Sequence, residues 1–485
     1  MIDARGNEVD SADRLRRTLE RQKAAQRAQG APDLRTRIDR LERLASLLKE
    51  NERALCESLR ADFGERSIQN AAMTEIAYPV SAIRYAQKHL SVWMRDERRK
   101  VAFLPSLFGA RARIRYQPLG VVGVIAPWNF PVNLAVTPLT DILAAGNRAM
   151  IKPSEFTPHN SALLAELVAR YFSEEEVAVF PGGLDIGAAF AALPFDHLMF
   201  TGAGTIARHV MRAAAEHLVP VTLELGGKSP VIVSRELPMG LDRAAACIVD
   251  FKLSNAGQIC IAPDYLFVPE ERLRDTVEAL RAAVGRMYPR LLDNPDYTSI
   301  INGRHLARLQ GYRDAAAAAG TEVIELNPAN ESFRGSPARK LPPTLVINPA
   351  DDQPIMREEI FGPLLPIRTY RDIDEVIDYI NGRDHPLALY YFGRRGGPEL
   401  ERVIARTQSG GVTVNDIAAH SGCEDLPFGG VGPSGMGAYH GYEGFKRFSH
   451  ARAVYVQSRI NLTDLFGMRP PFGKRYRSVI DRMMK

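Results

Sequence analysis

From Gly120 onward, short continuous apolar runs alternate with stretches of helical periodicity, and this alternation constrains the fold more than any other feature. The runs VVGVIAP, RAMIKP, VAVFPGG, HLMFTGA and PVTLELGG follow one another with helical stretches between them. Strands that are apolar at every position are typically buried on both faces, and strands separated by helices pair in parallel. The chain is therefore predicted to form parallel sheets with helices on both sides.

The same alternation continues in the second half, in the runs SPVIVS, DYLFVP, LALYYFG and GGVTVND. A chain of 485 residues is too long for one ordinary core, since single cores stop growing beyond about 250 residues. We predict an α/β fold with two doubly wound domains, one from 1–98 and 118–223 and the other from 224–418. A hinge is expected near 224–228.

The remaining segments cover these domains or extend from them. Apolar residues recur at helical spacing over 11–60, and another long helix is expected over 71–94. Within 99–117, short β-like runs flank a Pro/Gly turn, which predicts a hairpin arm. The basic tail at the end of 419–485 is expected to pack on a neighbouring chain or to be exposed.

One uncharged segment, 116–140, is long enough to span a bilayer. Four prolines would break a helix there, and Asn129 and Asn133 would need polar partners in lipid. We interpret the segment as a buried strand that leads into a loop and then a helix. No membrane span is predicted.

Charge and cysteine content argue against several classes of protein. Basic residues exceed acidic ones by 62 − 57 = 5 without any run of five like charges, so no nucleic-acid partner is indicated. The four cysteines form no CxxC pair and no zinc-binding pattern, so neither a disulfide framework nor a metal site is predicted. The first residues lack an apolar signal-peptide core. Free thiols without a signal favour a cytoplasmic protein.

Two glycine motifs are candidate phosphate-binding turns. GAGTIA, with Gly202, Gly204 and Ala207, follows an apolar run and opens a helical stretch, as a phosphate site at a helix N-terminus requires. GVGPSG contains Pro433 and no helical pattern follows it, so we interpret it as a loop. Glu224 lies 224 − 202 = 22 residues after Gly202, the spacing of a ribose-binding acid in ordinary dinucleotide folds. Spacing alone therefore favours a cofactor role for Glu224.

Four further motifs resemble the aldehyde dehydrogenase superfamily: PWNFP (127–131), LELGGKSP (223–230), GQIC (257–260) and EEIFGP (358–363). IKPSEFTP and FTG lie between the first two in the family's order. The short N-terminus and the run LPFGGVGPSGMGAYHG resemble the class 3-like branch, and within it the chain is most similar to bacterial coniferyl aldehyde dehydrogenases. The resemblance covers nearly the whole chain.

The resemblance implies the aldehyde dehydrogenase-like fold, with separate tasks for its parts. Segments 1–98 and 118–223 would bind the dinucleotide, and 224–418 would carry the catalytic cysteine. Segments 99–117 and 419–485 would form an oligomerisation arm and C-terminal tail, which implies a homodimer. The implied reaction is NAD(P)-dependent oxidation of an aldehyde to the carboxylic acid.

Aldehyde oxidation explains the need for a cysteine. A carbonyl group has no readily donated hydride, whereas the tetrahedral thiohemiacetal formed with a thiolate donates one to a nicotinamide, and the resulting thioester must be cleaved by water. The resemblance assigns the nucleophile to Cys260, whose small neighbours would let a substrate reach the sulfur. The alternative is an inert, small hydrophobic residue, which is our interpretation of Cys56, Cys247 and Cys423.

Two polar side chains complete the implied catalytic set. Asn129 would donate its amide to the oxyanion together with the backbone N–H of Cys260; its alternative is a turn asparagine between two prolines. Glu224 would activate the water that releases the acid. The alternatives are the ribose-binding role and an ordinary surface glutamate. Because Glu224 follows an apolar strand, partial burial is expected to raise its pKa.

The resemblance also implies seven residues that contact the cofactor: Lys152, Glu155, Gly202, Ala203, Gly226, Glu359 and Phe361. Lys152 and Glu155 would hold the adenine ribose, and Glu359 the nicotinamide ribose. The charge of Glu155 would repel a 2′-phosphate, which favours NAD, with NADP as the alternative because the class 3-like branch tolerates both. Ala203 stands where many relatives carry serine or asparagine, so the pyrophosphate would rely on backbone N–H groups.

The coniferyl-type resemblance favours an aromatic aldehyde such as coniferyl aldehyde, with Phe130 and Tyr78 as candidate pocket aromatics. Medium-chain aliphatic aldehydes, or cofactor-free thiol acyl transfer or hydrolysis, are the alternatives. We interpret Lys228 and Asn415 as structural and His440 as a packed loop histidine.

Overall fold

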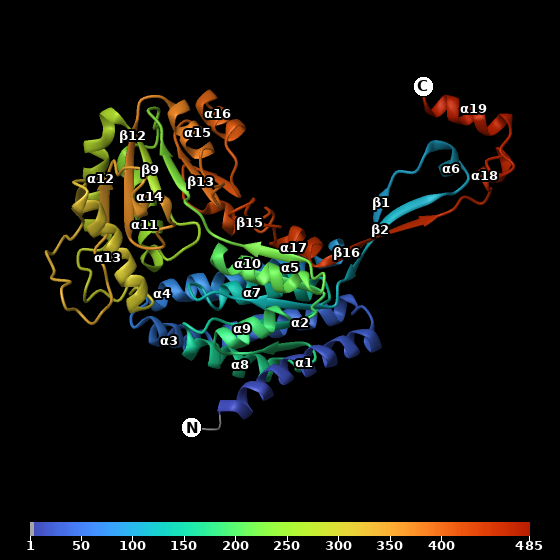
Figure 1. The fold of residues 1–485 in the computed structure, drawn as a ribbon, viewed down its shortest axis with the longest axis horizontal. Coiled ribbons are helices and arrows are strands. Elements are labelled where there is room, and N and C mark those ends of the chain that lie inside the picture. Colours follow the sequence, from blue (N-terminus) through green and yellow to red (C-terminus); the bar gives the residue numbers. More distant parts are fainter. Residues whose placement is uncertain (1–3) are drawn as a thin grey trace.

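The computed structural model describes residues 4–485 and contains three β-sheets. Two are large and mostly parallel, and the third is a small antiparallel sheet that projects from the body (Figure 1). The predicted fold class, two doubly wound α/β units with a small β arm, is confirmed. The first three residues of the segment 1–98 lie outside the described residues.

The N-terminal part is helical, as predicted. The pattern over 11–60 is divided among α1 (Ala4–Gln29), α2 (Leu34–Glu50) and α3 (Glu52–Phe63). The helix expected over 71–94 is longer and less regular: α4 (Ile68–Ala71) continues through a π-helical turn, η1 (Ala72–Ala77), into α5 (Tyr78–Trp93).

The first large sheet has the strand order β15-β7-β6-β3-β4-β5, and only β15 runs antiparallel to its neighbour. Its strands are β3 (Val121–Ile125), β4 (Arg148–Lys152), β5 (Val177–Val179), β6 (His197–Thr201), β7 (Val221–Glu224) and β15 (Gly435–Met436). The helices between the parallel strands are α7 (Asn133–Ala144), α8 (Pro158–Tyr171), α9 (Leu184–Ala191) and α10 (Gly204–Ala215).

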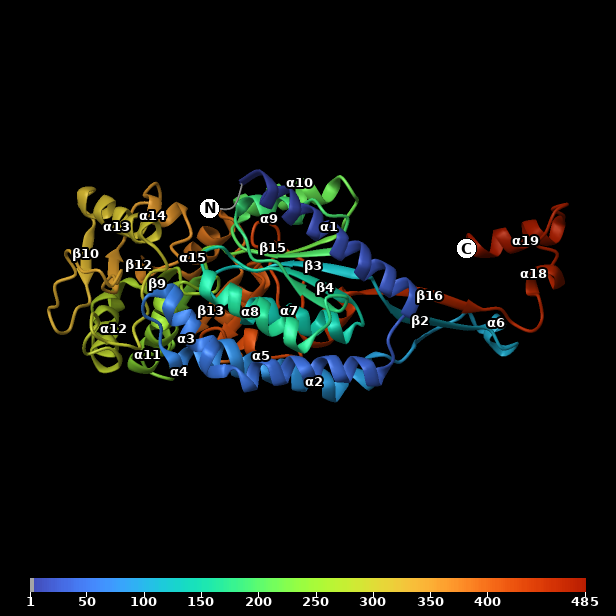
Figure 2. The ribbon, with the colours of Figure 1, turned by 90° about the horizontal axis from the view of Figure 1, so that it is seen from below.

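Alternate residues of these strands face opposite helical layers, and both faces are apolar. Val122 and Val124 share a buried cluster with residues of α2, α5, α7 and α8, whereas Val121 in the same strand packs with α1, α9 and α10. Figure 2 shows these two layers on the two sides of the sheet. Burial on both faces explains why the strands are apolar at every position.

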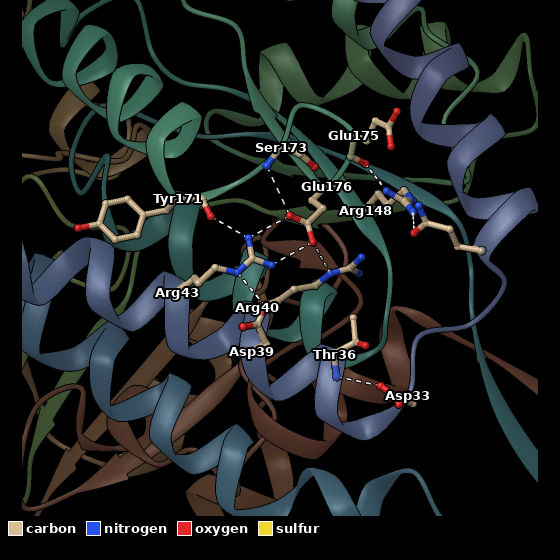
Figure 3. Close-up of polar contacts among 11 residues, drawn as sticks. Asp33, Thr36, Asp39, Arg40, Arg43, Arg148, Tyr171, Ser173, Glu175 and Glu176 are labelled. Carbon is tan, nitrogen blue, oxygen red and sulfur yellow. Dashed lines mark hydrogen bonds and ion pairs between the residues drawn. The ribbon is translucent and has the colours of Figure 1, made fainter.

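A cluster of charged side chains fixes α2 to the sheet (Figure 3). Glu176, just before β5, accepts from Nε of Arg40 at 3.0 Å and from Nη1 of Arg43 at 2.9 Å. Arg43 also donates to the carbonyl oxygen of Tyr171 at 2.7 Å. Burial opposes the ionisation of Glu176, but the hydrogen bonds and charges of both arginines outweigh it and lower the pKa to about 2.

The second large sheet has the order β10-β11-β12-β9-β8-β13-β14, with β10 antiparallel at one edge. Its strands are β8 (Pro230–Val233), β9 (Tyr265–Pro269), β10 (Glu322–Glu325), β11 (Thr344–Ile347), β12 (Leu364–Tyr370), β13 (Ala388–Phe392) and β14 (Gly411–Val414). Its helices are α11 (Leu241–Leu253), η2 (Ser254–Gly257), η3 (Glu270–Arg272), α12 (Leu273–Met287), α13 (Gly303–Ala318), α14 (Pro354–Arg357), α15 (Ile373–Asn381) and α16 (Pro398–Arg406). Val231 packs with α11 and α12, and Ile232 with α13, α15 and α16.

The small sheet forms the projecting arm. The predicted hairpin is present, because β1 (Glu97–Arg99) pairs antiparallel with β2 (Arg111–Pro118) across α6 (Phe103–Leu107). The sequence did not predict the third strand, β16 (Ser449–Val456), which pairs along all of β2. Beyond it, α18 (Leu462–Leu465) lies at the far end of the arm, and α19 (Lys474–Met483) turns back toward the body (Figures 1 and 2). Before β16 lie η4 (Ala419–Gly422) and α17 (Gly441–Arg447).

The uncharged segment 116–140 forms the end of β2, the buried β3, a loop and most of α7, so its interpretation as strand, loop and helix is confirmed. Pro138 lies within α7. Among the helices of the described chain, none is long and apolar enough to cross a membrane.

The connection between the two large sheets positions the site. Residues 225–229 join the end of β7 to the start of β8, so the carboxyl edge of the first sheet adjoins the amino edge of the second. Strands β9, β12 and β13 run parallel to β8. The loops that precede these strands therefore lie at the same edge.

Candidate active site

The candidate site lies where these two edges meet. In the first sheet, β4 ends at Lys152, β6 at Thr201 and β7 at Glu224, and Asn129 lies in the loop after β3. Strands β3 and β6 are neighbours, although the chain passes through β4 and β5 between them. In open α/β sheets, ligands bind outside the carboxyl ends of the strands at such a change of direction.

Cys260 lies on a strained turn that precedes β9. Before it, Asn255, Ala256 and Gly257 adopt φ values of 47°, 52° and 74° in succession. Residues with a side chain seldom adopt this conformation, and such strain persists where the surrounding structure enforces it. At Gly257, an added Cβ atom would overlap the carbonyl group of Gly362. The cysteine turn is thus packed directly against the loop that carries Glu359.

Amide side chains tie the cysteine turn to Asn129, which is 3% exposed. Asn129 donates through Nδ2 to the carbonyl oxygen of Gln258 at 3.2 Å, two residues before Cys260. In return, Asn255 donates to the carbonyl oxygen of Asn129 at 3.1 Å. A carboxamide carries two N–H donors, so Asn129 can donate one to this turn and one to a ligand oxygen beside the sulfur.

The thiol of Cys260 is half-buried and is influenced by two carboxyl groups. Burial raises the pKa of the thiol well above its ordinary value, and the charges of Glu224 and Glu359 raise it further. Both glutamates are therefore near enough to act on the thiol electrostatically. A thiol in such surroundings is protonated at neutral pH, so a base or a bound cationic group must assist its ionisation.

Glu224, the last residue of β7, is 1% exposed. Neither of its carboxyl oxygens has a hydrogen-bond partner among the residues that the structure describes. Burial raises the pKa of this carboxyl well above its ordinary value. The sequence predicted a shift in this direction. A buried carboxyl with a strongly raised pKa beside a thiol is a candidate for proton transfer.

Glu359 faces a glycine that makes room for it. A Cβ atom at Gly226 would overlap both carboxyl oxygens of Glu359, and the backbone N–H of Gly227 donates to the same group. Burial raises the pKa of Glu359 to about 8, and the charge of Asp264 adds to the effect. Within the described residues, Oε1 of Glu359 has no hydrogen-bond partner.

An aromatic contact joins this loop to the loop of Asn129. Phe361 adopts φ of 48°, and its ring centroid lies 5.3 Å from that of Trp128 in an edge-to-face arrangement. Trp128 directly precedes Asn129, so the loops 127–131 and 358–363 meet through their side chains.

The other predicted cofactor residues lie along the edge of the first sheet. Lys152 is 3% exposed, and its Nζ lies 3.1 Å from Oε2 of Glu155. This pair stands at the end of β4, one strand beyond β3. A Cβ atom at Gly202 would lie 2.8 Å from the ring of Phe200, and Ala203 is the exposed N-cap of α10. The motif GAGTIA thus forms the predicted strand, turn and helix.

The residues that we interpreted as structural make contacts that fit this role. Asn415 exchanges hydrogen bonds of 2.8 and 2.9 Å with the backbone of Gly393. His440 is 9% exposed, and its ring stacks on that of Phe428 with centroids 5.1 Å apart. Lys228 donates to Asp264 and to the backbone carbonyl groups of Ile355, in α14, and Glu358.

The two aromatic residues suggested for a substrate pocket differ in their surroundings. Phe130 is buried, and the guanidinium carbon of Arg66 lies 5.2 Å from its ring centroid. Tyr78, at the start of α5, is 54% exposed. The structure therefore brings Phe130 against a charged group of the N-terminal helices.

Asp264 is a site residue that the sequence analysis missed. It accepts from Lys228 and from the backbone N–H of Ile360 at 2.9 Å, so it joins the loops that carry Glu224, Cys260 and Glu359. These partners lie 36 and 96 residues away along the chain. The only signal in the sequence is its place four residues after the cysteine.

Comparison with known proteins agrees with these motifs. The model of the aldehyde dehydrogenase family matches residues 7–454. The coniferyl aldehyde dehydrogenase of Pseudomonas sp. strain HR199 is 51% identical over 98% of this chain and 97% of its own length. The dimeric NADP-preferring aldehyde dehydrogenase of Canis lupus familiaris is 36% identical over 94% of this chain and 98% of its own.

A solved structure shows the same architecture. The substrate-bound state of Staphylococcus aureus AldH superposes with a TM-score of 0.89 at 35% identity, over 97% of this chain and 99% of the other. The resemblance to this superfamily, to its class 3-like branch and to coniferyl aldehyde dehydrogenases is thus confirmed. The chain belongs to the aldehyde dehydrogenase family, and it is an oxidoreductase that oxidises aldehydes with a nicotinamide cofactor.

Proposed function

We propose that this enzyme oxidises an aromatic aldehyde, such as coniferyl aldehyde, to the carboxylic acid through a thioester on Cys260. One observation carries the cysteine route: the half-buried cysteine lies on a strained turn that is tied to the Asn129 amide, and two buried carboxyl groups act on its thiol electrostatically. The substrate class rests on the relatives near 50% identity, which are named coniferyl aldehyde dehydrogenases.

In the first step, the Cys260 thiol releases its proton to solvent water, and the resulting thiolate adds to the carbonyl carbon of the aldehyde. The carbonyl oxygen becomes an oxyanion and accepts hydrogen bonds from Nδ2 of Asn129 and the backbone N–H of Cys260. A preorganised donor of this kind typically lowers a barrier by about 3–4 kcal/mol. Loss of the carbon-bound hydrogen as hydride then converts the thiohemiacetal to the thioester.

In the second step, Glu224 takes a proton from the water that attacks the thioester, and the acid leaves with regeneration of the Cys260 thiol. Burial raises the pKa of Glu224, which makes its ionised form a stronger base. Neither oxygen has a hydrogen-bond partner in the described chain, so both keep their capacity to accept from such a water. The absence of competing hydrogen bonds therefore supports this role.

The residues present fit a nicotinamide dinucleotide. Gly226 leaves space beside the carboxyl of Glu359, and Oε1 of Glu359 has no partner in the described chain that would compete with a ribose hydroxyl. Gly202 and Ala203 open α10 at the edge where a pyrophosphate would lie. Phe361 would pack near the ring, and a bound nicotinamide would supply the acceptor for the hydride that the thiohemiacetal releases.

We infer that NAD is preferred and that NADP is also accepted. The carboxylate of Glu155 would accept from the hydroxyl groups of the adenine ribose and repel a 2′-phosphate. The ion pair with Lys152 at 3.1 Å offsets part of that repulsion. The dog relative named NADP-preferring supports the use of both cofactors.

We further infer a homodimer formed through the arm. We assign 1–98 and 118–223 to cofactor binding, 224–418 to catalysis, and 99–117 with 419–485 to oligomerisation. Apolar side chains of the arm are exposed in the single chain, among them Phe103 (75%), Tyr455 (55%) and Phe472 (61%). Sedimentation equilibrium tests the dimer, and a monomer at micromolar concentration would contradict it.

The Cys260→Ala variant tests the covalent route. It is expected to fold and to bind NAD, as judged by its melting temperature and by calorimetry, but to have no dehydrogenase turnover. Substantial residual oxidation would contradict a thioester. Steady-state kinetics of the unaltered enzyme with coniferyl aldehyde, benzaldehyde and hexanal, each with NAD and NADP, test the substrate class and the cofactor preference.

A further inference from the structure

A buried ion pair holds Asn129 from a second side. Nη2 of Arg66 lies 2.8 Å from Oε1 of Glu75, and their side chains are 1% and 0% exposed. The other carboxylate oxygen of Glu75 accepts from the backbone N–H groups of Val132 at 3.0 Å and Asn133 at 2.8 Å. These groups belong to the start of α7, directly after the turn that carries Asn129. Glu75 thus fixes the end of that turn.

The same pair also contacts the turn through its arginine. The guanidinium carbon of Arg66 lies 5.2 Å from the ring centroid of Phe130, the residue after Asn129. In addition, Nδ2 of Asn133 donates to the carbonyl oxygen of Thr74 at 2.8 Å. The chain on the carboxyl side of Asn129 is therefore bound to the N-terminal helices at its backbone and at two side chains.

Thr74 and Glu75 lie in the π-helical turn η1. Such turns are rare and are frequently found at functional sites. Here the irregular turn places a carboxylate under the start of a helix on another segment, where the unpaired N–H groups and the helix dipole favour negative charge. The same π-helical turn that interrupts the helical segment 68–93 thus also fixes the start of α7.

Stability alone does not explain a fully buried charge pair at this place. Burial disfavours both charges: it lowers the pKa of Arg66 and raises that of Glu75, and their mutual attraction opposes both shifts. Well-packed apolar residues of similar volume are often equally stabilising or better. What an ion pair adds is a fixed geometry for its hydrogen-bonded partners.

We propose that Arg66 and Glu75 are positioning residues that set the amide of Asn129 at the oxyanion site beside Cys260. This inference rests on the oxyanion role of Asn129 in the proposed function. On the cysteine side, the carbonyl oxygen of Gln258 accepts from the Asn129 amide and Asn255 donates to the backbone carbonyl of Asn129. The Arg66–Glu75 pair holds the backbone that follows Asn129 from the opposite side. A donor displaced by about 1 Å can cost about a hundredfold in rate.

A double-mutant cycle tests the proposal. The measured quantity is the rate constant of the first-turnover NADH burst at saturating aldehyde and NAD. Glu75→Gln keeps an oxygen for the α7 N–H groups but removes the charge that pairs with Arg66. It is expected to lower the burst rate constant about tenfold or more, with little change in the affinity for NAD. In the Asn129→Ala background, the same exchange is expected to change it less than about twofold.

Glu176→Gln is the matched control. It also replaces a largely buried carboxylate that pairs with arginine, but at the contact between α2 and the start of β5. It is expected to lower the melting temperature and to leave the burst rate constant unchanged. Loss of a buried ion pair as such is thereby separated from loss of position at Asn129.

The outcomes separate failure of the oxyanion role of Asn129 from failure of the positioning role of Arg66 and Glu75. If Asn129→Ala alone leaves the burst unchanged, the oxyanion role itself fails. If Asn129→Ala slows the burst but Glu75→Gln slows it by the same factor with and without Asn129, the positioning role is overturned. The same holds if Glu75→Gln lowers only the melting temperature. If Glu75→Gln does not fold, Arg66→Lys replaces it under the same criteria, because lysine keeps the charge but not the planar contact with Phe130.

Discussion

The raised pKa of Glu359 leads to a quantitative prediction about cofactor binding. Burial raises this pKa to about 8, so about nine in ten of these groups are protonated at neutral pH. If the nicotinamide ribose is bound through its two hydroxyl groups, the ionised carboxylate is the form that accepts both. Binding of NAD must then release a proton, at about 1.4 kcal/mol for each unit by which the pH lies below the pKa.

The sign and size of the effect follow from this linkage. The ionised fraction of Glu359 in the free enzyme rises as the pH rises through about 8, so NAD binds more tightly until the pH exceeds the pKa. If the bound-state pKa lies far lower, the dissociation constant scales as 1 + 10^(pKa − pH). This factor falls from about 33 at about pH 6.5 to about 1.1 at about pH 9, a roughly thirtyfold gain in affinity.

Isothermal titration calorimetry of NAD with the Cys260→Ala variant measures this dependence without the thiol. NAD is the better ligand for the test, because the 2′-phosphate of NADP titrates near pH 6. Glu359→Gln in the same background is the control and is expected to bind weakly with little dependence on pH. Lys252, whose pKa burial lowers to about 8, is present in both proteins. The linkage between Glu359 ionisation and NAD binding is refuted if the affinity for NAD falls with rising pH, or if Glu359→Gln keeps the thirtyfold gain in affinity.

Three further predictions concern single side chains. Glu224→Gln is expected to keep the NADH burst but to slow steady-state turnover at least about a hundredfold, because the thioester lacks its base; normal steady-state turnover would reject that role. Gly226→Ala is expected to weaken NAD binding at least about tenfold while circular dichroism stays unchanged, because its Cβ overlaps the carboxyl of Glu359; unaltered affinity would show that Glu359 is not held there. Glu176, with a pKa of about 2 in the folded protein, contributes up to about 3 kcal/mol of stability above its unfolded pKa of about 4.3, and this is lost as the pH falls toward 2. Denaturant unfolding of Glu176→Gln should therefore converge with the unaltered enzyme in acid, and a constant difference down to pH 2 would contradict the assignment.

The sequence predicted those parts of the fold that depend on regular burial. Val121 and Val122 face different helical layers, and both are fully buried, so an uninterrupted apolar run was enough to predict a parallel strand. Strand β16 carries no such signal, because most of its residues are exposed and its partner β2 lies more than 300 residues earlier. An exposed arm leaves no pattern of burial in the sequence from which its pairing could be read.

For the site, the sequence predicted which residue types are present but not how they are held. Cys260, Asn129 and Glu359 were proposed as site residues because each lies in a short motif. The left-handed conformation of Asn255 and Ala256 was not predicted, because nothing in those residue types demands it. It occurs where the next residue, Gly257, packs against the 358–363 loop, a contact between distant segments of the chain. Ion pairs such as Arg66–Glu75 also escape notice, because a charged residue in a helical stretch usually faces solvent.

The buried carboxyl groups of this enzyme differ in how many protein partners their oxygens have. Glu75 is as buried as Glu224, yet it has an arginine and two backbone N–H groups, whereas both oxygens of Glu224 and one of Glu359 lack partners within the described chain. Oε2 of Glu75 accepts both hydrogen bonds, and its Oε1 lies 2.8 Å from the guanidinium of Arg66. An unpaired buried polar group costs about 1–3 kcal/mol, so a buried carboxyl such as Glu224, with no donor at either oxygen in the described chain, needs an explanation. Glu224 and Glu359 are also the two carboxyl groups whose charges act on the thiol of Cys260. These missing partners fit the ligand atoms proposed above: a ribose hydroxyl at Glu359 and the attacking water at Glu224.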